Sequence, residues 1–149
     1  MAYMKKYSIF YANLKEKGYK LTSQRKIIFD AILAHNEKHV TADEIYQFIK
    51  KEHPEIGIAT VYRNVQLLSD MNIVEKLNLD DGFTRYKLVL DDEKHRHHHL
   101  ICNSCNTIIE VREDLMDSIE KLFDENYGFL VSDHQTKFFG LCQNCRKAK

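Results

Sequence analysis

The sequence has little of what non-globular proteins are made of. One proline and five glycines among 149 residues exclude collagen-like and low-complexity chains. A composition of 44% hydrophobic and 30% charged residues excludes extensive disorder. A chain of this length buries roughly 70% of its unfolded surface, so it forms one ordinary domain or two small ones.

Long hydrophobic runs are missing as well. No stretch approaches the roughly 18 consecutive apolar residues of a membrane span, and the start, MAYMKKYSIFYANLKEK, lacks the apolar run of a signal peptide. We therefore expect a cytoplasmic protein with no membrane partner. In a reducing compartment, the four cysteines indicate metal ligands or catalytic thiols rather than structural disulfides.

The chain has no excess of either charge, because 22 basic side chains balance 22 acidic ones. Overall basicity therefore gives no sign of a nucleic-acid partner. The distribution is uneven, however, since residues 1–29 carry seven Lys and Arg and a single acid, Glu16. This local excess fits either a nucleic-acid contact or an ordinary solvated helix face.

Apolar residues recur at helical spacing through the first seventy residues and predict three helices. The pair Thr22-Ser23 can cap the first helix. A capping box of Thr41 and Glu44 opens the second, which must end before Pro54. The third runs over Ile58–Met71. The expected inward positions are Ile28, Ala31, Ile32, Ile45, Phe48, Ile49, Val61, Val65 and Leu68.

The period changes to two after the third helix. Residues 73–79 (IVEKLNL) and 83–90 (FTRYKLVL) read as strands around Asp81-Gly82, a dipeptide typical of hairpin turns. Three helices and a hairpin predict a winged helix-turn-helix over residues 1–88. Its third helix would present a polar face, including Tyr62, to the DNA major groove. A small helical domain with a solvated polar face is the alternative.

The composition shifts after residues 89–94 (VLDDEK), a polar stretch expected to be a hinge. Five of the eight histidines and all four cysteines lie in residues 95–149, which we interpret as a second domain. The whole chain is therefore predicted to be α/β, in an α+β arrangement. Expected in the second domain are strands at 97–101, 107–111, 129–132 and 137–141, a helix at 114–125 with Leu115, Ile119, Leu122 and Phe123 inward, and a helix end at Gly128.

Two C-x-x-C pairs, Cys102-Asn-Ser-Cys105 and Cys142-Gln-Asn-Cys145, are separated by 36 residues. Each tight turn can direct two sulfurs at one ion, and two pairs complete the tetrahedral thiolate set that zinc favours. We therefore predict a structural zinc site. The alternative, a redox-active thiol pair, needs only one of the two motifs.

A histidine run, residues 95–99 (HRHHH), comes directly before the first cysteine pair. On a strand, side chains alternate between faces, so His97 and His99 share one face and His98 lies on the other. One segment can therefore contribute ligands to two separate metal ions. The alternative is a solvated run or an adventitious metal trap.

Six stretches in order along nearly the whole chain are YKLTSQR (19–25), HVTADEIY (39–46), PEIGIATVYRNVQLL (54–68), DGFTRYKL (81–88), HHHLICNSC (97–105) and DHQTKFFGLCQNC (133–145). Together they resemble the ferric uptake regulator family of bacterial metal-dependent repressors. The resemblance implies an N-terminal winged helix joined by a hinge to a C-terminal α/β dimerisation domain. It also implies a homodimer that binds an A/T-rich inverted-repeat operator in double-stranded DNA.

The resemblance also assigns site residues. It implies structural Zn(II) on Cys102, Cys105, Cys142 and Cys145, and a regulatory ion on His39, His97, His99 and Glu110. It implies an additional metal site on His98, Asp117 and His134, and DNA contacts by Lys20, Thr60, Tyr62 and Arg63. Mixed nitrogen and oxygen ligation suits Fe(II), for which Mn(II) or Zn(II) can substitute.

Two positions depart from the family pattern. Lys87 stands where relatives commonly supply a carboxylate to the regulatory site, and an ammonium cannot ligate a metal. Either the site has fewer ligands, or Asp80 or Asp81 substitutes. Arg96 stands where a further histidine of the additional site often occurs, so that site is weaker or rebuilt around His95.

The leading hypothesis is an iron-responsive repressor that has no small-molecule substrate and is not an enzyme. A peroxide-sensing repressor of the same family favours aspartates at the positions of Lys87 and Glu110, and both are missing. A zinc-sensing repressor remains a third alternative. Outside the family, a metal beside Glu110 could activate water for hydrolysis, but no substrate pocket is indicated. A metal-storage module would need no DNA-reading face.

Overall fold

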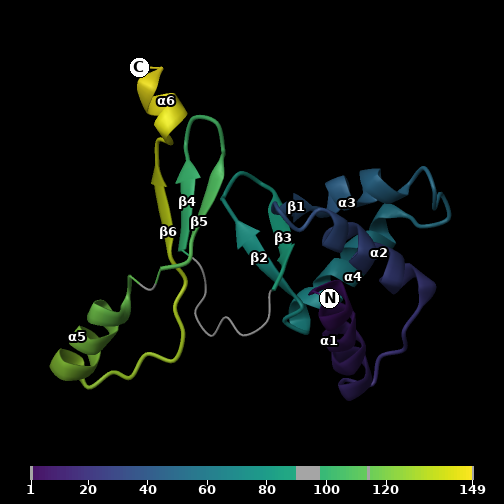
Figure 1. Cartoon of the computed structure of the whole chain (residues 1–149), viewed down its shortest axis with the longest axis horizontal. Helices are drawn as coiled ribbons and strands as arrows, with labels where there is room; N and C mark the ends of the chain where they lie inside the picture. The colour runs from purple at the N-terminus through teal and green to yellow at the C-terminus, as the bar shows by residue number, and fades with distance from the viewer. Residues whose placement is uncertain (1, 90–97, 114, 149) are drawn as a thin grey trace. The chain divides into compact units, whose positions relative to one another are not determined.

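The computed structural model describes residues 2–89, 98–113 and 115–148. The chain divides into two compact units, Met1–Asp91 and Asp92–Lys149 (Figure 1). The predicted hinge lies outside the described residues apart from Val89, and so does His97. In the described ranges, no helix combines the length and the apolar character that crossing a bilayer requires.

The first unit contains helices and a three-stranded sheet. Its elements are α1 (Ala2–Glu16), α2 (Ser23–Ala34), β1 (Val40–Thr41), α3 (Ala42–Ile49), α4 (Ile58–Asp70), β2 (Val74–Asn78) and β3 (Thr84–Leu88). The strand order is β1-β3-β2, and both pairings are antiparallel. Helices α2, α3 and α4 followed by the β2–β3 hairpin form the predicted winged helix-turn-helix, with the hairpin as its wing (Figure 1).

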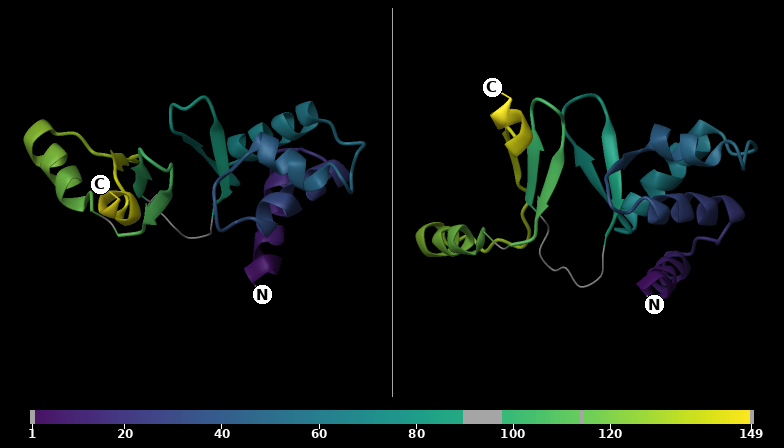
Figure 2. Two further views of the ribbon diagram at one scale, coloured as in Figure 1. Left: turned by 90° about the horizontal axis from the view of Figure 1, so that it is seen from above. Right: turned by 45° about the horizontal axis from the view of Figure 1, so that its top comes forward.

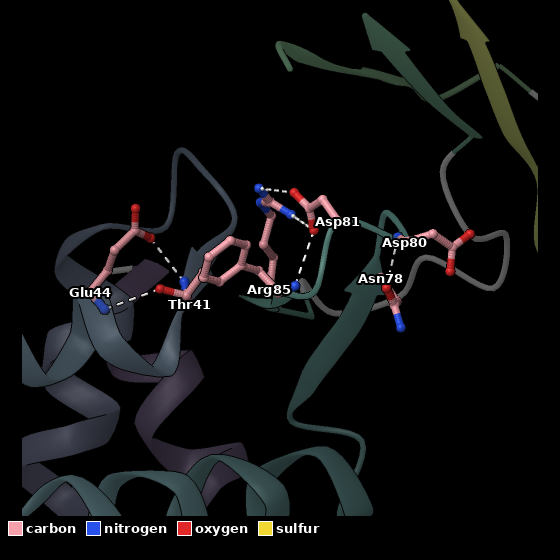
Figure 3. A network of polar contacts seen from close by, with 7 residues as sticks. Thr41, Glu44, Asn78, Asp80, Asp81 and Arg85 are labelled. Carbon is pink, nitrogen blue, oxygen red and sulfur yellow. Dashed lines mark hydrogen bonds and ion pairs between the residues drawn. The ribbon is translucent and has the colours of Figure 1, made fainter. Parts of the chain in front are cut away.

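Local polar contacts fix where the helices of the first unit begin. Thr22 Oγ1 accepts from the Arg25 backbone N–H at 3.2 Å and caps α2. At α3, Thr41 Oγ1 accepts from Glu44 N at 3.1 Å while the Glu44 carboxylate accepts from Thr41 N at 2.9 Å (Figure 3). Both predicted caps are confirmed, and they satisfy N–H groups that have no partner within the helix.

The wing turn is closed by an aspartate and an arginine. Asp80 and Gly82 adopt left-handed backbone conformations, with φ of 59° and 86°, and glycine adopts this conformation without steric strain. The Asp81 carboxylate accepts from Arg85 at 2.8 and 3.2 Å (Figure 3). This hydrogen-bonded ion pair lowers the pKa of the Asp81 carboxyl.

The core of the first unit lies between its helices and the inner face of the sheet. Eight of the nine predicted inward residues are buried: Ile28, Ala31, Ile32, Ile45, Ile49, Val61, Val65 and Leu68. The prediction was wrong for Phe48, which is 36% exposed. Its ring stacks on His35 with centroids 3.7 Å apart, so a neighbouring side chain rather than the core covers one of its faces.

Helix α1 was not predicted, although two of its side chains belong to this core. Phe10 and Leu14 are almost fully buried, and the Phe10 ring lies 4.2 Å from the Phe29 ring in a stacked arrangement. The Tyr7 hydroxyl donates to the Asp30 carboxylate on α2. The basic N-terminal segment is therefore also a core helix.

The second unit is a small sheet with two helices. Its elements are β4 (His98–Cys102), β5 (Ile108–Val111), α5 (Asp117–Tyr127), β6 (Lys137–Gly140) and α6 (Gln143–Lys147). Strand β4 lies in the centre, antiparallel to β5 and parallel to β6. Gly128 ends α5 in the left-handed region, at φ 61°, as predicted.

Three sequence predictions for the second unit need correction. Residues 129–132 form no strand, because no described strand of the unit pairs with them. Helix α6 was not expected. The apolar stripe of α5 is exposed rather than inward, at 41% for Ile119 and 48% for Leu122, and Figures 1 and 2 show α5 set off from the strands.

Phe10→Ala tests the role of α1. Removing this buried ring leaves a cavity against Phe29, so we expect the first unit to lose about 3–5 kcal/mol of unfolding free energy. Urea unfolding followed by circular dichroism measures the loss. Met4 lies on the same helix and is 76% exposed, so Met4→Ala should change stability by no more than about 0.5 kcal/mol. Equal effects of the two variants would contradict a core role for α1.

Candidate metal centres and nucleic-acid interface

The four cysteines converge in the second unit. Cys102 ends β4, Cys105 lies in the following turn, Cys142 caps α6 and Cys145 lies in its first turn. All four thiols are free, and their sulfurs lie within 4.8 Å of one another. Cys105 Sγ and Cys142 Sγ are 3.7 Å apart, while tetrahedral zinc with bonds of about 2.3 Å places its sulfurs about 3.8 Å apart. The set therefore fits zinc.

The surroundings of Cys102 and Cys105 favour thiolate, whereas those of Cys145 do not. The backbone N–H of Cys142, 3.4 Å from Cys102 Sγ, acts with the backbone N–H of Cys105 to lower the pKa of the Cys102 thiol to about 6. Thr107 lowers the pKa of the Cys105 thiol by hydrogen bonding. A hydrogen bond with Ser104 lowers the pKa of the Cys145 thiol, but the three neighbouring sulfurs together raise it to about 12. A bound cation would replace the repulsion among these sulfurs with attraction.

His39, directly before β1, lies beside a carboxylate that the sequence did not single out. Its Nε2–H donates to Glu75 Oε1 at 3.1 Å. Glu75 lies on β2, and its register partner on the neighbouring strand β3 is Lys87. Pairing of β1 and β2 with β3 brings His39 and Glu75 together. Because no local sequence motif marks Glu75, the sequence alone gave no indication of this contact.

Neither proposed substitute for the missing carboxylate joins a potential metal site. The Asp81 carboxylate is held by Arg85. The Asp80 backbone N–H donates to the Asn78 side chain at the wing turn (Figure 3). Within the described part of the chain, neither aspartate belongs to a group of three or more potential ligands.

Strand β4 separates neighbouring histidines. His99 is the register partner of Glu110 on β5, so these two predicted ligands project from the same face of the second unit's sheet. His98 is 2% exposed and points to the other face, where its ring stacks on His134 with centroids 5.5 Å apart. His98 and His99 therefore lie on opposite faces, as the strand period predicts, and the predicted place of His97 beside His99 falls outside the described residues.

The predicted additional site assembles only in part. His98 and His134 lie together, but the carboxylate beside His134 is Glu120, whose Oε1 lies 2.6 Å from His134 Nδ1. Asp117 instead contacts Lys121 at 3.3 Å. Among the described residues, Asp117 joins no cluster with these histidines. Glu120 is one helical turn further along α5 than the predicted carboxylate.

Helix α4 presents the predicted polar face. Tyr62 and Arg63 are exposed, opposite the buried Val61–Val65–Leu68 stripe. The Tyr62 hydroxyl donates to Asp43 at 2.9 Å, which raises the pKa of Tyr62, and Arg63 donates to Thr60 Oγ1 at 3.4 Å. Lys20, in the loop before α2, is exposed. These groups can contact phosphates and base edges.

Comparisons with known proteins agree with one another. The family model for the Ferric uptake regulator family matches residues 16–139. The Ferric uptake regulation protein of Bacillus subtilis is 39% identical over 132 residues, 89% of each chain. The peroxide-responsive repressor PerR of Staphylococcus saprophyticus is 34% identical over 134 residues, 90% of this chain and 87% of the relative.

A solved structure of the Francisella tularensis ferric uptake regulator with iron has a TM-score of 0.75 at 29% identity, and the match covers 87% of this chain and 96% of that one. The fold, the sequence motifs and the sequence identity thus all match the same family over most of the chain. The protein belongs to the Ferric uptake regulator family.

Proposed function

We propose that this protein is an Fe(II)-responsive transcriptional repressor that acts in the cytoplasm and is not an enzyme. It binds an A/T-rich inverted-repeat operator as a homodimer. One combination of features carries the proposal. This member of the family has an exposed polar face on α4 and a His–carboxylate pair in each unit, His39 with Glu75 and His99 with Glu110. A storage module would have no use for the polar face of α4.

Structural Zn(II) is assigned to the four cysteines. Its support is the convergence of four free sulfurs within 4.8 Å of one another, with Cys105 Sγ and Cys142 Sγ at the spacing that tetrahedral zinc requires. Cys142 and Cys145 on α6 would thereby be tied to Cys102 at the end of β4, and the sheet would be held closed at that end. Zinc bound in this way contributes directly to the folding free energy.

The regulatory ion is assigned to His39, His97, His99 and Glu110. His39 comes from the first unit and the other three from the second. Imidazole and carboxylate ligands suit Fe(II), and Mn(II) or Zn(II) can take the same set. Fe(II) is preferred over peroxide sensing because Glu110 and Lys87 stand where peroxide sensors favour aspartates.

Ligands from both units explain how metal controls DNA binding. A bound ion supplies one ligation point shared by His39 and the second-unit residues. Sharing it restricts the range of orientations of each DNA-reading helix in a symmetric dimer, and preorganisation of this kind favours operator binding. A shift from mostly unproductive to mostly productive orientations needs about 3–5 kcal/mol of differential metal affinity.

The dimer interface is assigned to the second unit. Its apolar side chains are more exposed than a stable single chain would leave them, at 62% for Phe129 and 83% for Leu130 beside the exposed stripe of α5. Large apolar side chains left exposed in this way indicate an interface with another chain. A second copy, related by a two-fold axis, is the partner that the family provides.

The first experiment is anaerobic fluorescence anisotropy of the zinc-loaded protein on an inverted-repeat A/T-rich duplex, at fixed salt. We expect micromolar Fe(II) to tighten binding. A response to Zn(II) alone would indicate a zinc sensor, and tight binding without added metal would contradict metal-dependent repression.

Arg63→Ala tests the reading face in the same assay. Loss of one base contact should cost about 1–3 kcal/mol, or roughly 5- to 150-fold in affinity. Lys147→Ala removes an equal charge from α6 in the second unit and should leave operator affinity unchanged. If Arg63→Ala bound the operator as tightly as the wild type, a storage module would become the better interpretation.

His99→Ala tests the regulatory site. The variant should keep its zinc and its dimeric state but lose the Fe(II)-dependent increase in operator affinity. His53, which lies on the first unit 3.4 Å from Glu55, provides the control, since His53→Ala should respond to Fe(II) as the wild type does. A full Fe(II) response in His99→Ala would refute this assignment.

Cys105→Ser tests the structural zinc. We expect the purified variant to contain less than one tenth of the wild-type zinc by elemental analysis, because one thiolate of the tetrahedral set is gone. The second unit should then unfold at a lower temperature. Ser104→Ala, which keeps all four sulfurs, should retain zinc; retention of zinc by Cys105→Ser as well would mean that Cys105 is not a ligand.

A further inference from the structure

The contact between His39 and Glu75 is unexplained by the functions assigned so far. It joins the loop before β1 to the first strand of the wing, and its two ends are an imidazole nitrogen and a carboxylate oxygen 3.1 Å apart. We propose that Glu75 is a ligand of the regulatory metal ion and supplies from β2 the carboxylate that Lys87 removes from β3. This inference rests on the proposed function.

The register of the wing makes the exchange possible. Glu75 and Lys87 are directly opposite in an antiparallel pair, so their side chains share one face of the sheet, with Cβ atoms about 4.5–5.5 Å apart. A carboxylate on either strand can therefore reach the same region beside the sheet. Moving the carboxylate from β3 to β2 changes the strand that carries it but leaves it on the same face of the sheet.

The separation of the two donor atoms fits metal ligation. Two neighbouring ligands with bonds of about 2.0–2.2 Å lie roughly 3.0–3.3 Å apart in octahedral or tetrahedral coordination. His39 Nε2 and Glu75 Oε1, at 3.1 Å, are already at this separation. A metal ion can thus replace the proton between them with little rearrangement of either side chain.

The rival carboxylates are less suitable. Asp81 would have to give up two hydrogen bonds from Arg85, at 2.8 and 3.2 Å. Asp80 lies at the tip of the wing in a left-handed conformation, and among the described residues neither aspartate belongs to the group of potential ligands that contains His39. Glu75, by contrast, already contacts the predicted ligand His39.

A positioning role is the competing explanation for Glu75. Carboxylates often accept from one nitrogen of a histidine whose other nitrogen binds the metal. In that case Glu75 would orient His39 without contacting the ion. The two roles differ in the coordination sphere, so a spectroscopic measurement separates them.

The test uses Co(II) as the probe on the full-length protein with its zinc retained. Co(II) affinity is measured by competition with a chromogenic chelator, and the visible absorption of bound Co(II) reports its ligand set. The variants are Glu75→Gln, which keeps the side-chain shape, the double exchange Glu75→Lys/Lys87→Glu, and Glu52→Gln as an exposed control on the same unit. Circular dichroism checks that each variant is folded.

We expect Glu75→Gln to weaken Co(II) binding by at least about 10-fold, because the loss of even an outer-shell partner costs about 10- to 100-fold, and to change the visible spectrum. The double exchange should restore affinity to within about threefold of the wild type, because it returns the carboxylate to the same face. Glu52→Gln should match the wild type in both measurements.

Unchanged Co(II) affinity and an unchanged spectrum in Glu75→Gln would overturn the proposal. Weaker binding with an unchanged spectrum, and no rescue by the double exchange, would also overturn it, because that result would indicate a positioning residue. In both cases His99→Ala would still lose Co(II), and the proposed function would stand. If the zinc-loaded wild type bound no Co(II), the regulatory site itself would be wrong, and both proposals would fail together.

Discussion

The alternation of side chains along β4 is the constraint on which the second unit depends. This central strand presents His98 to one face, against His134, and His99 to the other, in register with Glu110. It then ends at Cys102, where the four sulfurs converge. Because a strand has period two, a slip of one residue would exchange the two histidines and disrupt three clusters at once. One five-residue strand therefore sets the chemistry of the whole unit.

In the first unit, burial of one side of α4 determines which of its side chains are available to contact DNA. Val61, Val65 and Leu68 anchor α4 in the core, so its remaining face must be exposed. Tyr62 is further restrained by its hydrogen bond to Asp43 on α3. A helix fixed by its core and restrained on its surface would lose little side-chain entropy on binding DNA.

Periodic patterns and capping residues made most of the fold predictable. The capping box at Thr41 and the Asp-Gly wing turn are local signals, and both were read correctly. A periodic pattern does not indicate whether an apolar stripe is covered by its own chain or by another. Leu122 is therefore predicted to face inward, but the structure leaves it exposed. Glu75 and Glu120 were missed for another reason: each contacts its histidine through strand register or chain reversal, and neither is encoded in spacing along the sequence.

The small core of the second unit explains why the proposed structural site and the proposed sensing site would use different ligands. Among its described residues only four are buried, all on β4: His98, His99, Ile101 and Cys102. So small a core does not hold a unit of this size together, and a metal or a partner chain must contribute the rest. Thiolates bind zinc tightly enough for that structural task. A sensing site must release its ion as conditions change, so weaker nitrogen and oxygen ligands suit it better.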